Sequence, residues 1–465
     1  MPILVAPSRP FDVEVDVLII GGGACGLTAA LSAFDTGATP LVLERWSSCM
    51  GSSAMSLGAL CAAGTQEQDA HGVEDSAAIF LADIMAKTGG KANPLIARTV
   101  AEQSGIALDW LAQQHGIVFE LDLGWRPAFG HSRQRLHAVK ERTGADMMTR
   151  LINGCEAKGI DILTDAHVTD LFATEDGAVA GVRMRRPDAS IEDIGCKTLV
   201  LATCGFGGNR EMVADYIPTM KTARYFGWEP NQGDAIVWGQ ALGAAVADMD
   251  AYQGLGLLAD PQGIDVNPKL LIEGGIQINS LGQRFSNELD DVSGQGARLI
   301  AQPEGYGWVI YDERIHQIAL GFPQYQTLME LGALKVADGT AQLAQVIGVD
   351  RVQLKSTLDI VTGLQTVGGT DEFGRVFDKT PLTGPLYALR VTGAIFHTQG
   401  GLVIDAEARV MRPDGSRLAN LFAGGGAARG ISGSGPSGYL PGAGLCSAVT
   451  LGYLAGQSAG RLSRQ

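Results

Sequence analysis

The stretch Asp16-Val-Leu-Ile-Ile-Gly-Gly-Gly-Ala-Cys-Gly26 decides the fold. Its first five residues form a short, mostly β-branched apolar run, which is typical of a strand buried on both faces. Glycines 21, 23 and 26 follow as GxGxxG, and a helix of small residues is expected over Leu27–Thr36. Pro40–Glu44 is expected to be the next strand, and it ends in an acid. Together these elements predict a complete βαβ unit.

Each glycine of this unit has a physical role in binding a dinucleotide. Gly21 permits the turn, Gly23 admits a pyrophosphate against bare backbone, and Gly26 lets the helix pack on the strand. The helix N-terminus offers N–H groups and a positive dipole end to the phosphates. Glu44 is placed to accept hydrogen bonds from both ribose hydroxyls. The alternatives are an ordinary glycine turn and a solvated acid at a strand end.

Composition and charge narrow the partners. The chain has 465 residues, of which 63 are glycine, so close approach of backbone to a ligand is expected. It carries 35 Lys and Arg against 50 Asp and Glu, and a net charge of −15 argues against nucleic acid and membrane surfaces as partners. Seven scattered cysteines without CxxC indicate a reducing compartment and no metal site. With no signal-peptide pattern, a cytoplasmic location is expected.

The amino-acid composition changes twice along the chain. Glycine-rich segments dominate up to about Trp228 and again from Ala394, whereas short strands and helices mix between them. We therefore expect an α/β fold in which residues 1–227 and 366–465 form one Rossmann-like domain with a doubly wound parallel sheet. Residues 228–365 are expected to form an inserted α+β domain, whose size is within the usual range.

Two further segments favour FAD over NAD. Met50–Gly58 is rich in small residues that can line an extended ligand beyond its pyrophosphate. Leu421–Gly426 repeats the pattern of a strand running into glycines, and a helix begins near Gly444. A second helix N-terminus suits a flavin, because the reduced ring carries negative charge at N1 and O2.

Several motifs together resemble one flavoprotein family, which contains fumarate reductases, succinate dehydrogenases and ketosteroid dehydrogenases. They are the GxGxxG unit, Gly51–Gly58, Ala202–Asn209, Gly233-Asp234, Gly282–Glu288, Asp371–Arg375 and His397–Leu402. The resemblance implies an FAD-binding domain with an inserted cap domain that closes over the flavin. It also implies the chemistry, in which two hydrogens leave or join a C–C bond next to a carbonyl and hydride moves to or from flavin N5.

The resemblance further implies which residues contact FAD. Added to the three glycines, they are Cys25, Glu44, Ser52, Ser53, Gly58, Val168, Ala202, Asp234, Gly444 and Leu445. Ser52 stands where membrane-bound relatives carry the histidine that attaches FAD, so non-covalent FAD is expected. Gly425 replaces an acid that many relatives have.

Arg284 and His397 are expected to be catalytic by the same resemblance. Arg284 is similar to the arginine that donates a proton in soluble fumarate reductases, although a pKa above about 12 limits it to one link in a proton chain. A carbonyl clamp or a structural ion pair with Glu288 are the alternatives. His397 resembles the histidine that binds substrate beside the flavin, and Thr398 is its expected substrate-binding neighbour.

The C-terminal segment Gly438–Gly444 resembles ketosteroid dehydrogenases, in which a tyrosine hydroxyl and a glycine N–H bind the ketone oxygen. Tyr439 is therefore expected to be catalytic, as clamp or base, and Gly442 to bind substrate. Leu440 offsets the tyrosine by one residue, and the alternative is a tyrosine packed at a helix start. Arg135 and His137 alternate with Arg133, so in an extended segment they would share a face and bind a carboxylate. A solvated basic strand is the alternative there.

The departures from the family narrow the substrate. No histidine follows Gln253, and the arginine that grips the far carboxylate of a dicarboxylate is absent, although Arg429 is a replacement candidate. We therefore expect an FAD-dependent dehydrogenase that desaturates a cyclic ketone or keto acid and passes electrons to an acceptor that the sequence does not identify. Reduction of an unsaturated acid, as in soluble fumarate reductases, is the alternative. A redox-sensing or electron-transfer flavoprotein without substrate chemistry is a different class.

Overall fold

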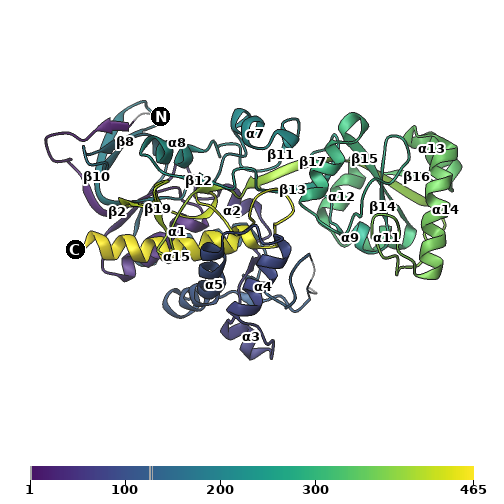
Figure 1. Cartoon of the computed structure of the whole chain (residues 1–465), viewed down its shortest axis with the longest axis horizontal. Coiled ribbons are helices and arrows are strands. Elements are labelled where there is room, and N and C mark those ends of the chain that lie inside the picture. Colours follow the sequence, from purple (N-terminus) through teal and green to yellow (C-terminus); the bar gives the residue numbers. More distant parts are fainter. Residues whose placement is uncertain (1–2, 125–126, 128) are drawn as a thin grey trace. The chain divides into compact units, whose positions relative to one another are not determined.

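The structure, a computed structural model, describes residues 3–124, 127 and 129–465. The chain divides into two compact units. Unit 1 comprises Met1–Met212, Gly227–Tyr252 and His397–Gln465, and unit 2 comprises Val213–Phe226 and Gln253–Phe396. Figure 1 labels elements from both units and colours the chain from purple at the N-terminus to yellow at the C-terminus.

A largely parallel sheet forms the centre of unit 1. Its strand order is β1-β8-β9-β10-β2-β3-β7, with β20 beside β10 and β19 beside β20. The strands are β1 (Ile3–Val5), β2 (Glu14–Ile20), β3 (Pro40–Leu43), β7 (Asp161–Leu163), β8 (His167–Ala173), β9 (Val179–Arg185), β10 (Ile191–Leu201), β19 (Arg409–Met411) and β20 (Arg417–Ala423). β2 pairs in parallel with β3 and β10, and β10 pairs in parallel with β20. The expected α/β class with a parallel sheet is thus confirmed.

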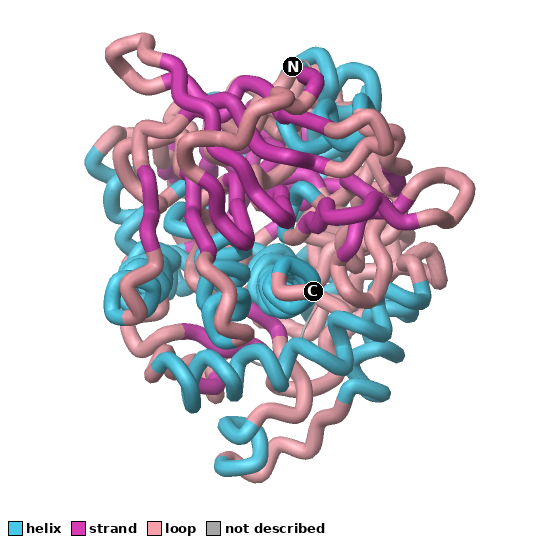
Figure 2. The backbone as a smooth tube through the Cα atoms, turned by 90° about the vertical axis from the view of Figure 1, so that its left-hand side faces the viewer, coloured by secondary structure: helices cyan, strands magenta, loops and turns pink. Residues whose placement is uncertain are grey.

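Helices cover this sheet because small residues let them approach closely. α15 (Ala443–Ser463) packs along α1 (Ala24–Asp35), and a Cβ on Gly456 would lie only 2.1 Å from the Ala29 carbonyl oxygen. In Figure 2 the magenta strands form a layer, and α15, whose end is marked C, lies beneath it in contact with β2, β10 and β20. Gly452 meets Cys25 and Gly460 meets Ala33, so α15 runs in the same direction as α1, and both helices begin at the end of the sheet where β2 runs into its glycines.

The remaining elements of unit 1 surround the sheet. The helices are α2 (Gly51–Met55), α3 (Gln66–Ala70), α4 (Ala77–Lys87), α5 (Pro94–His115), α6 (Gly144–Ala157), α8 (Asp234–Ala241) and η3 (Gly425–Ala427). α7 (Arg210–Tyr216) begins in unit 1, and its residues from Val213 on belong to unit 2. Short strands are β4 (Leu60–Cys61), β5 (Glu120–Leu121), β6 (Leu136–Ala138), β12 (Val246–Ala247) and β18 (Gly401–Leu402). α5 shows how local sequence sets such bounds, because Asn93 caps its first N–H groups and Gly116 ends it at φ +68°.

Unit 2 is a sheet with an apolar core on each face. Along β15 (Tyr306–Asp312), Val309 and Tyr311 enter one core while Trp308 and Ile310 enter the other. The other strands are β11 (Arg224–Tyr225), β13 (Tyr252–Ala259), β14 (Ile276–Asn279), β16 (Lys335–Ala337) and β17 (Leu386–Thr398). The helices are η1 (Pro218–Met220), α9 (Lys269–Ile272), α10 (Gly294–Ile300), η2 (Pro303–Gly305), α11 (Glu313–Ala319), α12 (Pro323–Glu330), α13 (Thr340–Ile347) and α14 (Arg351–Val367).

The bounds of unit 2 differ from the inserted domain expected at 228–365. β17 belongs mostly to unit 2 because it pairs with β15 from Leu386 to Thr392. Glycine content does not reveal this pairing, which joins segments far apart in the chain. The assignment of FAD-binding and cap roles to the two units stays a prediction. Of the helices in the described ranges, none has both the length and the apolar character that a membrane crossing requires.

Candidate functional site

A cavity in unit 1 opens where β2 runs into its glycine-rich turn. Its empty volume is about 830 Å³, which includes space open to solvent. The expected FAD contacts among its lining residues are Gly21, Gly23, Cys25, Glu44, Ser52, Ser53, Val168 and Ala202. Segments from both parts of the expected Rossmann-like domain line it, since Gly425, Gly426 and Ala448 also contribute. We call this space the cofactor cavity.

The three motif glycines have different surroundings in the structure. A Cβ on Gly21, whose φ is +107°, would lie 2.4 Å from the Ala202 carbonyl oxygen, and one on Gly26 would lie 1.8 Å from the Gly21 carbonyl oxygen. A Cβ on Gly23 would meet, among described atoms, only the Ser53 hydroxyl at 3.4 Å. Gly21 and Gly26 are therefore needed for packing, whereas Gly23 leaves bare backbone at the N-terminus of α1. This cradle fits the pyrophosphate of a dinucleotide.

Glu44 is held from two sides. The Gly22 N–H donates to Oε2 at 2.8 Å, and the Trp46 N–H donates to Oε1 at 3.0 Å. Each carboxylate oxygen can accept more than one hydrogen bond, so both retain capacity for ribose hydroxyls. The geometry therefore suits the role that the sequence predicts for this acid.

Among the lining residues that sequence reasoning missed are Arg45, Trp46, Trp228 and Asn231. Arg45 forms an ion pair with Asp234, so Asp234 reaches the cavity through the arginine instead of lining it. The rings of Trp46 and Trp228 meet edge to face, with centroids 5.8 Å apart. Arg45 and Trp46 directly follow Glu44, so their position in the chain could have indicated them. Trp228 and Asn231 reach the cavity only through the fold.

Two further expected FAD contacts are explained by packing. Gly26, described above, and Gly58 do not line the cofactor cavity. Gly58 has φ +66°, and a Cβ there would lie 2.6 Å from the Thr143 carbonyl oxygen. Thr143 caps α6, so Gly58 lets the chain after α2 press against the start of that helix.

A second group of polar atoms gathers at the N-terminus of α15. It consists of His397, Tyr439, Gly442 and Gly444, and we call it the α15 cluster. A Cβ on Gly444 would lie 2.9 Å from His397 Nε2 and 3.7 Å from the Tyr439 hydroxyl oxygen. The His397 and Tyr439 rings meet edge to face at 5.8 Å. Gly444 thus belongs to this cluster, and neither Gly444 nor Leu445 lines the cofactor cavity.

Hydrogen bonds determine which nitrogen of His397 carries the proton. Gln399 Nε2 lies 2.7 Å from His397 Nδ1, and Gln399 Oε1 accepts from the Ser432 hydroxyl at 3.2 Å. The glutamine amide therefore donates to Nδ1. The Thr398 carbonyl oxygen also lies 3.4 Å from Nδ1, but this contact is much longer than the glutamine bond, so the proton of the neutral ring is assigned to Nε2. Burial lowers the pKa of His397 to about 4, so the ring is neutral at pH 7. His397 thus presents an N–H donor toward Gly444.

The Tyr439 hydroxyl can also donate a hydrogen bond, again because its surroundings favour the neutral form. Burial raises the pKa of its hydroxyl, even though the backbone N–H groups of Gly444 and Gly442 face the oxygen and favour tyrosinate. The hydroxyl is therefore protonated at neutral pH. The α15 cluster brings together N–H and O–H donors in a partly buried place, which is the arrangement that polarises a carbonyl oxygen.

Thr398 lies next to this cluster but faces away from it. Its hydroxyl accepts from the Phe206 N–H at 3.1 Å, and a Cβ on Gly205 would lie 2.0 Å from that hydroxyl. The side chain is buried against the loop that follows β10. These contacts explain Thr398 as a packing residue, and its expected contact with substrate has no support in them.

Arg284 lies in unit 2 inside a buried ion network. It donates to both carboxylate oxygens of Glu288 at 2.8 Å and also to Asp371. Arg375 donates to the same Glu288 at 2.9 Å, and the Phe377 ring lies 5.1 Å from the Arg284 guanidinium. The sequence left three roles open for Arg284: a link in a proton chain, a carbonyl clamp or a structural ion pair. The structure contains the ion pair with Glu288. A proton-donor role for Arg284 has no support in these contacts.

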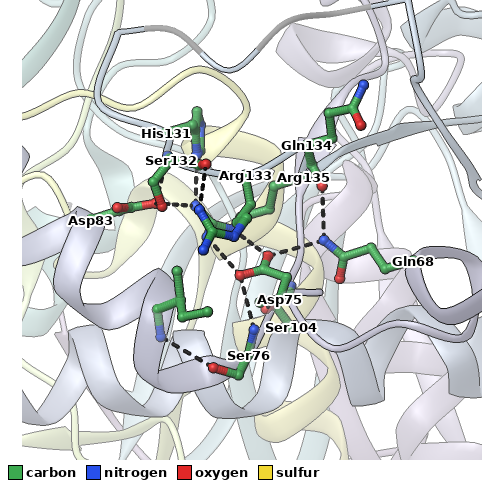
Figure 3. Close-up of polar contacts among 12 residues, drawn as sticks. Gln68, Asp75, Ser76, Asp83, Ser104, His131, Ser132, Arg133, Gln134 and Arg135 are labelled. Atoms are coloured by element: carbon green, nitrogen blue, oxygen red, sulfur yellow. Dashed lines mark hydrogen bonds and ion pairs between the residues drawn. The ribbon is translucent and has the colours of Figure 1, made fainter. Parts of the chain in front are cut away.

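Arg135 and His137 do not form the exposed basic face that their alternation suggested. Both side chains are fully buried, and β6 includes His137 but not Arg135. Arg135 binds the carboxylates of Asp75 and Asp83 (Figure 3). His137 Nε2 lies 2.8 Å from the Thr65 hydroxyl. The protein's own carboxylates therefore bind Arg135, for which a substrate carboxylate was the expected partner. Arg429 is likewise paired, with Asp248.

Comparison with known proteins identifies the family. A family model described as FAD binding domain matches residues 16–446. The chain belongs to this family. The flavoprotein is 29% identical over 447 residues to a probable fumarate reductase of Shewanella frigidimarina, which covers 96% of this chain and 74% of that protein. The expected membership and the expected cofactor, FAD, are thereby confirmed.

Two solved structures resemble this flavoprotein over nearly its whole length. The open conformation of a flavocytochrome c3 fumarate reductase matches with a TM-score of 0.83 and 28% identity, covering 98% of this chain and 79% of that one. A 3-ketosteroid-Δ4-(5α)-dehydrogenase from Rhodococcus jostii matches with a TM-score of 0.81 and 25% identity, covering 99% of both chains. The protein is an FAD-dependent oxidoreductase, and its fold is similar to both of these enzymes.

Proposed function

We propose that this flavoprotein desaturates the C–C bond next to the carbonyl of a cyclic ketone or keto acid. The observation that carries the proposal is the α15 cluster, in which neutral donors converge beside the N-terminus of a helix. The structural similarity to a ketosteroid dehydrogenase supports a ketone, and the similarity to fumarate reductases supports chemistry at a C–C double bond.

The residues of the cofactor cavity would hold FAD, with Gly23 and the start of α1 at the pyrophosphate and Glu44 at the ribose. FAD supplies the acceptor for a hydride. Ser52 lines the cavity, where its hydroxyl accepts from Asn231 Nδ2 at 2.8 Å, and a serine offers no imidazole nitrogen to which a flavin could be attached. Denaturation in acid should release the whole flavin into the supernatant, whereas retention on the denatured chain would contradict non-covalent binding.

At the α15 cluster, the ketone oxygen would accept hydrogen bonds from the Tyr439 hydroxyl and the backbone N–H of Gly442 or Gly444. These bonds stabilise the enolate-like charge that forms when a base accepts the α-proton, which acidifies that carbon. His397 adds a neutral N–H donor. Because burial raises the pKa of Tyr439, the hydroxyl is better suited to donate to the ketone than to act as the base.

Reduction of an unsaturated acid is the second candidate function. Its support is the similarity to the probable fumarate reductase over 96% of this chain. The pairing of the candidate arginines argues against this function. Arg135, Arg284 and Arg429 all bind carboxylates of the protein itself instead of being available for the carboxylate of a substrate.

An anaerobic titration separates the two functions. Purified protein should be mixed in turn with saturated cyclic ketones, with the matching cyclic alcohols and with succinate, and the flavin absorbance should be followed. We expect bleaching by a ketone and none by its alcohol, since only the ketone offers an oxygen to polarise. If reduced enzyme is instead reoxidised by unsaturated acids and no ketone bleaches it, the desaturase proposal fails.

A further inference from the structure

The peptide between Pro441 and Gly442 connects the α15 cluster to a buried network elsewhere in unit 1. Its carbonyl oxygen lies 2.9 Å from His131 Nε2, and its N–H faces the Tyr439 hydroxyl oxygen. In a planar trans peptide these two groups point in opposite directions. A hydrogen bond to the carbonyl therefore fixes where the N–H points.

Arg135 determines which nitrogen of His131 donates. Arg135 Nη1 lies 3.1 Å from His131 Nδ1, and a guanidinium can only donate. Nδ1 must accept, so the proton is on Nε2 and is donated to Pro441. Burial lowers the pKa of His131 to about 4, which keeps the ring in this neutral form. The charged groups that act on the ring are Arg135, Asp83 and Asp75.

Arg135 is itself rigidly held. Its Nε and Nη2 donate to the two oxygens of Asp75 at 2.7 and 2.8 Å, and its Nη1 donates to Asp83 at 2.7 Å (Figure 3). The guanidinium lies over the Phe80 ring, 4.6 Å from its centroid. Asp83 also accepts from the backbone N–H and the hydroxyl of Ser132, each at 2.9 Å. The segment that carries His131 is therefore fastened to α4 through Asp83, and to the residues just before that helix by the bidentate ion pair with Asp75.

The turn before α15 also packs closely against β4 and against the segment that carries His131. Gly442 has φ +80°, and a Cβ there would lie 2.9 Å from the Cys61 amide nitrogen. A Cβ on Gly130 would lie 2.8 Å from a methyl group of Leu440. Neighbouring segments thus enclose the turn before α15 on two sides. The hydrogen bond from His131 to the Pro441 carbonyl oxygen adds a directional contact that packing alone does not provide.

We propose that His131 is a positioning residue for the α15 cluster: by donating to the Pro441 carbonyl it aims the Gly442 N–H at the oxygen bound beside Tyr439, with Arg135 holding the donor tautomer. A donor at the carbonyl also polarises the peptide and strengthens its N–H as a donor, by roughly 10–30% per bond. The catalytic importance of Gly442 rests on the proposed function, whereas the orientation of the peptide does not.

The test compares His131→Phe, which removes the donor at similar size, with His131→Gln, whose amide can still donate to Pro441. His115→Phe is the matched control, because His115 is a histidine with a buried side chain that binds Asp35 instead of the turn. FAD affinity, hydrogen exchange of the peptide spanning residues 438–446, and kcat and KM for a ketone are measured for all four proteins.

For His131→Phe we expect FAD affinity within about twofold of wild type, exchange in residues 438–446 faster by about tenfold, and kcat lower by about tenfold with little change in KM. His131→Gln should recover most of the exchange protection and of kcat. Wild-type exchange and kcat in His131→Phe, or equal losses in His115→Phe, would overturn the inference. If the wild-type flavin is reduced by no ketone, the proposed function fails, yet the exchange data still decide whether His131 orients the turn.

Discussion

The cofactor cavity and the α15 cluster are built in different ways within one unit. The cavity is shaped by backbone, because glycines with positive φ or no room for a Cβ bring the main chain to its edge. The α15 cluster is shaped by side chains, whose protonation is set by burial and by neighbours such as Gln399. Substitutions that disturb the backbone at the cavity should therefore abolish FAD binding or destabilise the fold. Changes in side chains at the cluster should alter the reaction while FAD stays bound.

The largest effect is expected from Gly21→Ala. A Cβ would collide with the Ala202 carbonyl between β2 and β10 and would also strain the φ of +107°, so we expect destabilisation by more than about 3 kcal/mol and loss of flavin. Gly72→Ala is the matched control, since its φ is +68° but no described atom lies within 4 Å of its Cβ position. Thermal midpoint and flavin content check this, and equal losses in the two variants would contradict a backbone-built cavity.

Glu44→Gln should affect FAD affinity more than folding. The amide keeps the size of the side chain but loses the charge and one acceptor for the Gly22 or Trp46 N–H, so affinity should fall by about 30-fold, or about 2 kcal/mol. Flavin fluorescence during titration measures this. Glu120→Gln, at an exposed strand position, is the control, and affinity that is unchanged in Glu44→Gln would rule out the ribose role.

Tyr439→Phe should leave FAD binding unchanged and lower kcat by about tenfold or more, because one neutral donor to the ketone is lost. Tyr453→Phe, farther along the same helix, removes a hydroxyl that accepts from Gln457 and should not change kcat. Steady-state kinetics with a ketone check the pair. Equal kcat in wild type and Tyr439→Phe would assign the tyrosine to packing, the alternative that its sequence context allows.

The smallest effect concerns pH. The pKa values of His131, His137 and His397 are lowered by burial to about 4 from an ordinary value of 6.5. As pH falls from 6.5 to 4, the unfolded chain binds protons that the native histidines do not, so stability falls through this window and is unaffected by these groups above it. Each histidine contributes about 1.4 kcal/mol per pH unit at most.

His137→Asn should therefore reduce the slope of the thermal midpoint against pH between 6.5 and 4. Exposed His71→Asn provides the comparison. If both variants keep the wild-type slope, the buried neutral state of His137 is wrong.

Much of the cavity could be predicted from the sequence, because its determinants are local. The strand, the glycine turn and the acid that ends the next strand lie within residues 16–44, and β2, α1 and β3 form there. Contacts between distant segments could not be predicted in this way. Arg135 finds Asp75 and Asp83 only after folding, and its alternation with His137 suggested an open face.

The α15 cluster could be predicted from the sequence only in part. The motifs indicated His397 and Tyr439, but the tautomer of His397 depends on Gln399 and Ser432, and the aim of Gly442 depends on His131. Protonation and orientation are properties of packing, which one-dimensional patterns do not contain.

The central claim is that the flavoprotein removes hydrogens from the bond beside a ketone. The most direct measurement is a single anaerobic turnover with a saturated cyclic ketone deuterated at the β-carbon, followed by mass analysis of the product. We predict an α,β-unsaturated ketone that has lost one β-deuterium, with flavin bleaching slower than for the unlabelled ketone. An unchanged ketone beside oxidised flavin, while an unsaturated acid is reduced by the same reduced enzyme, would contradict the claim.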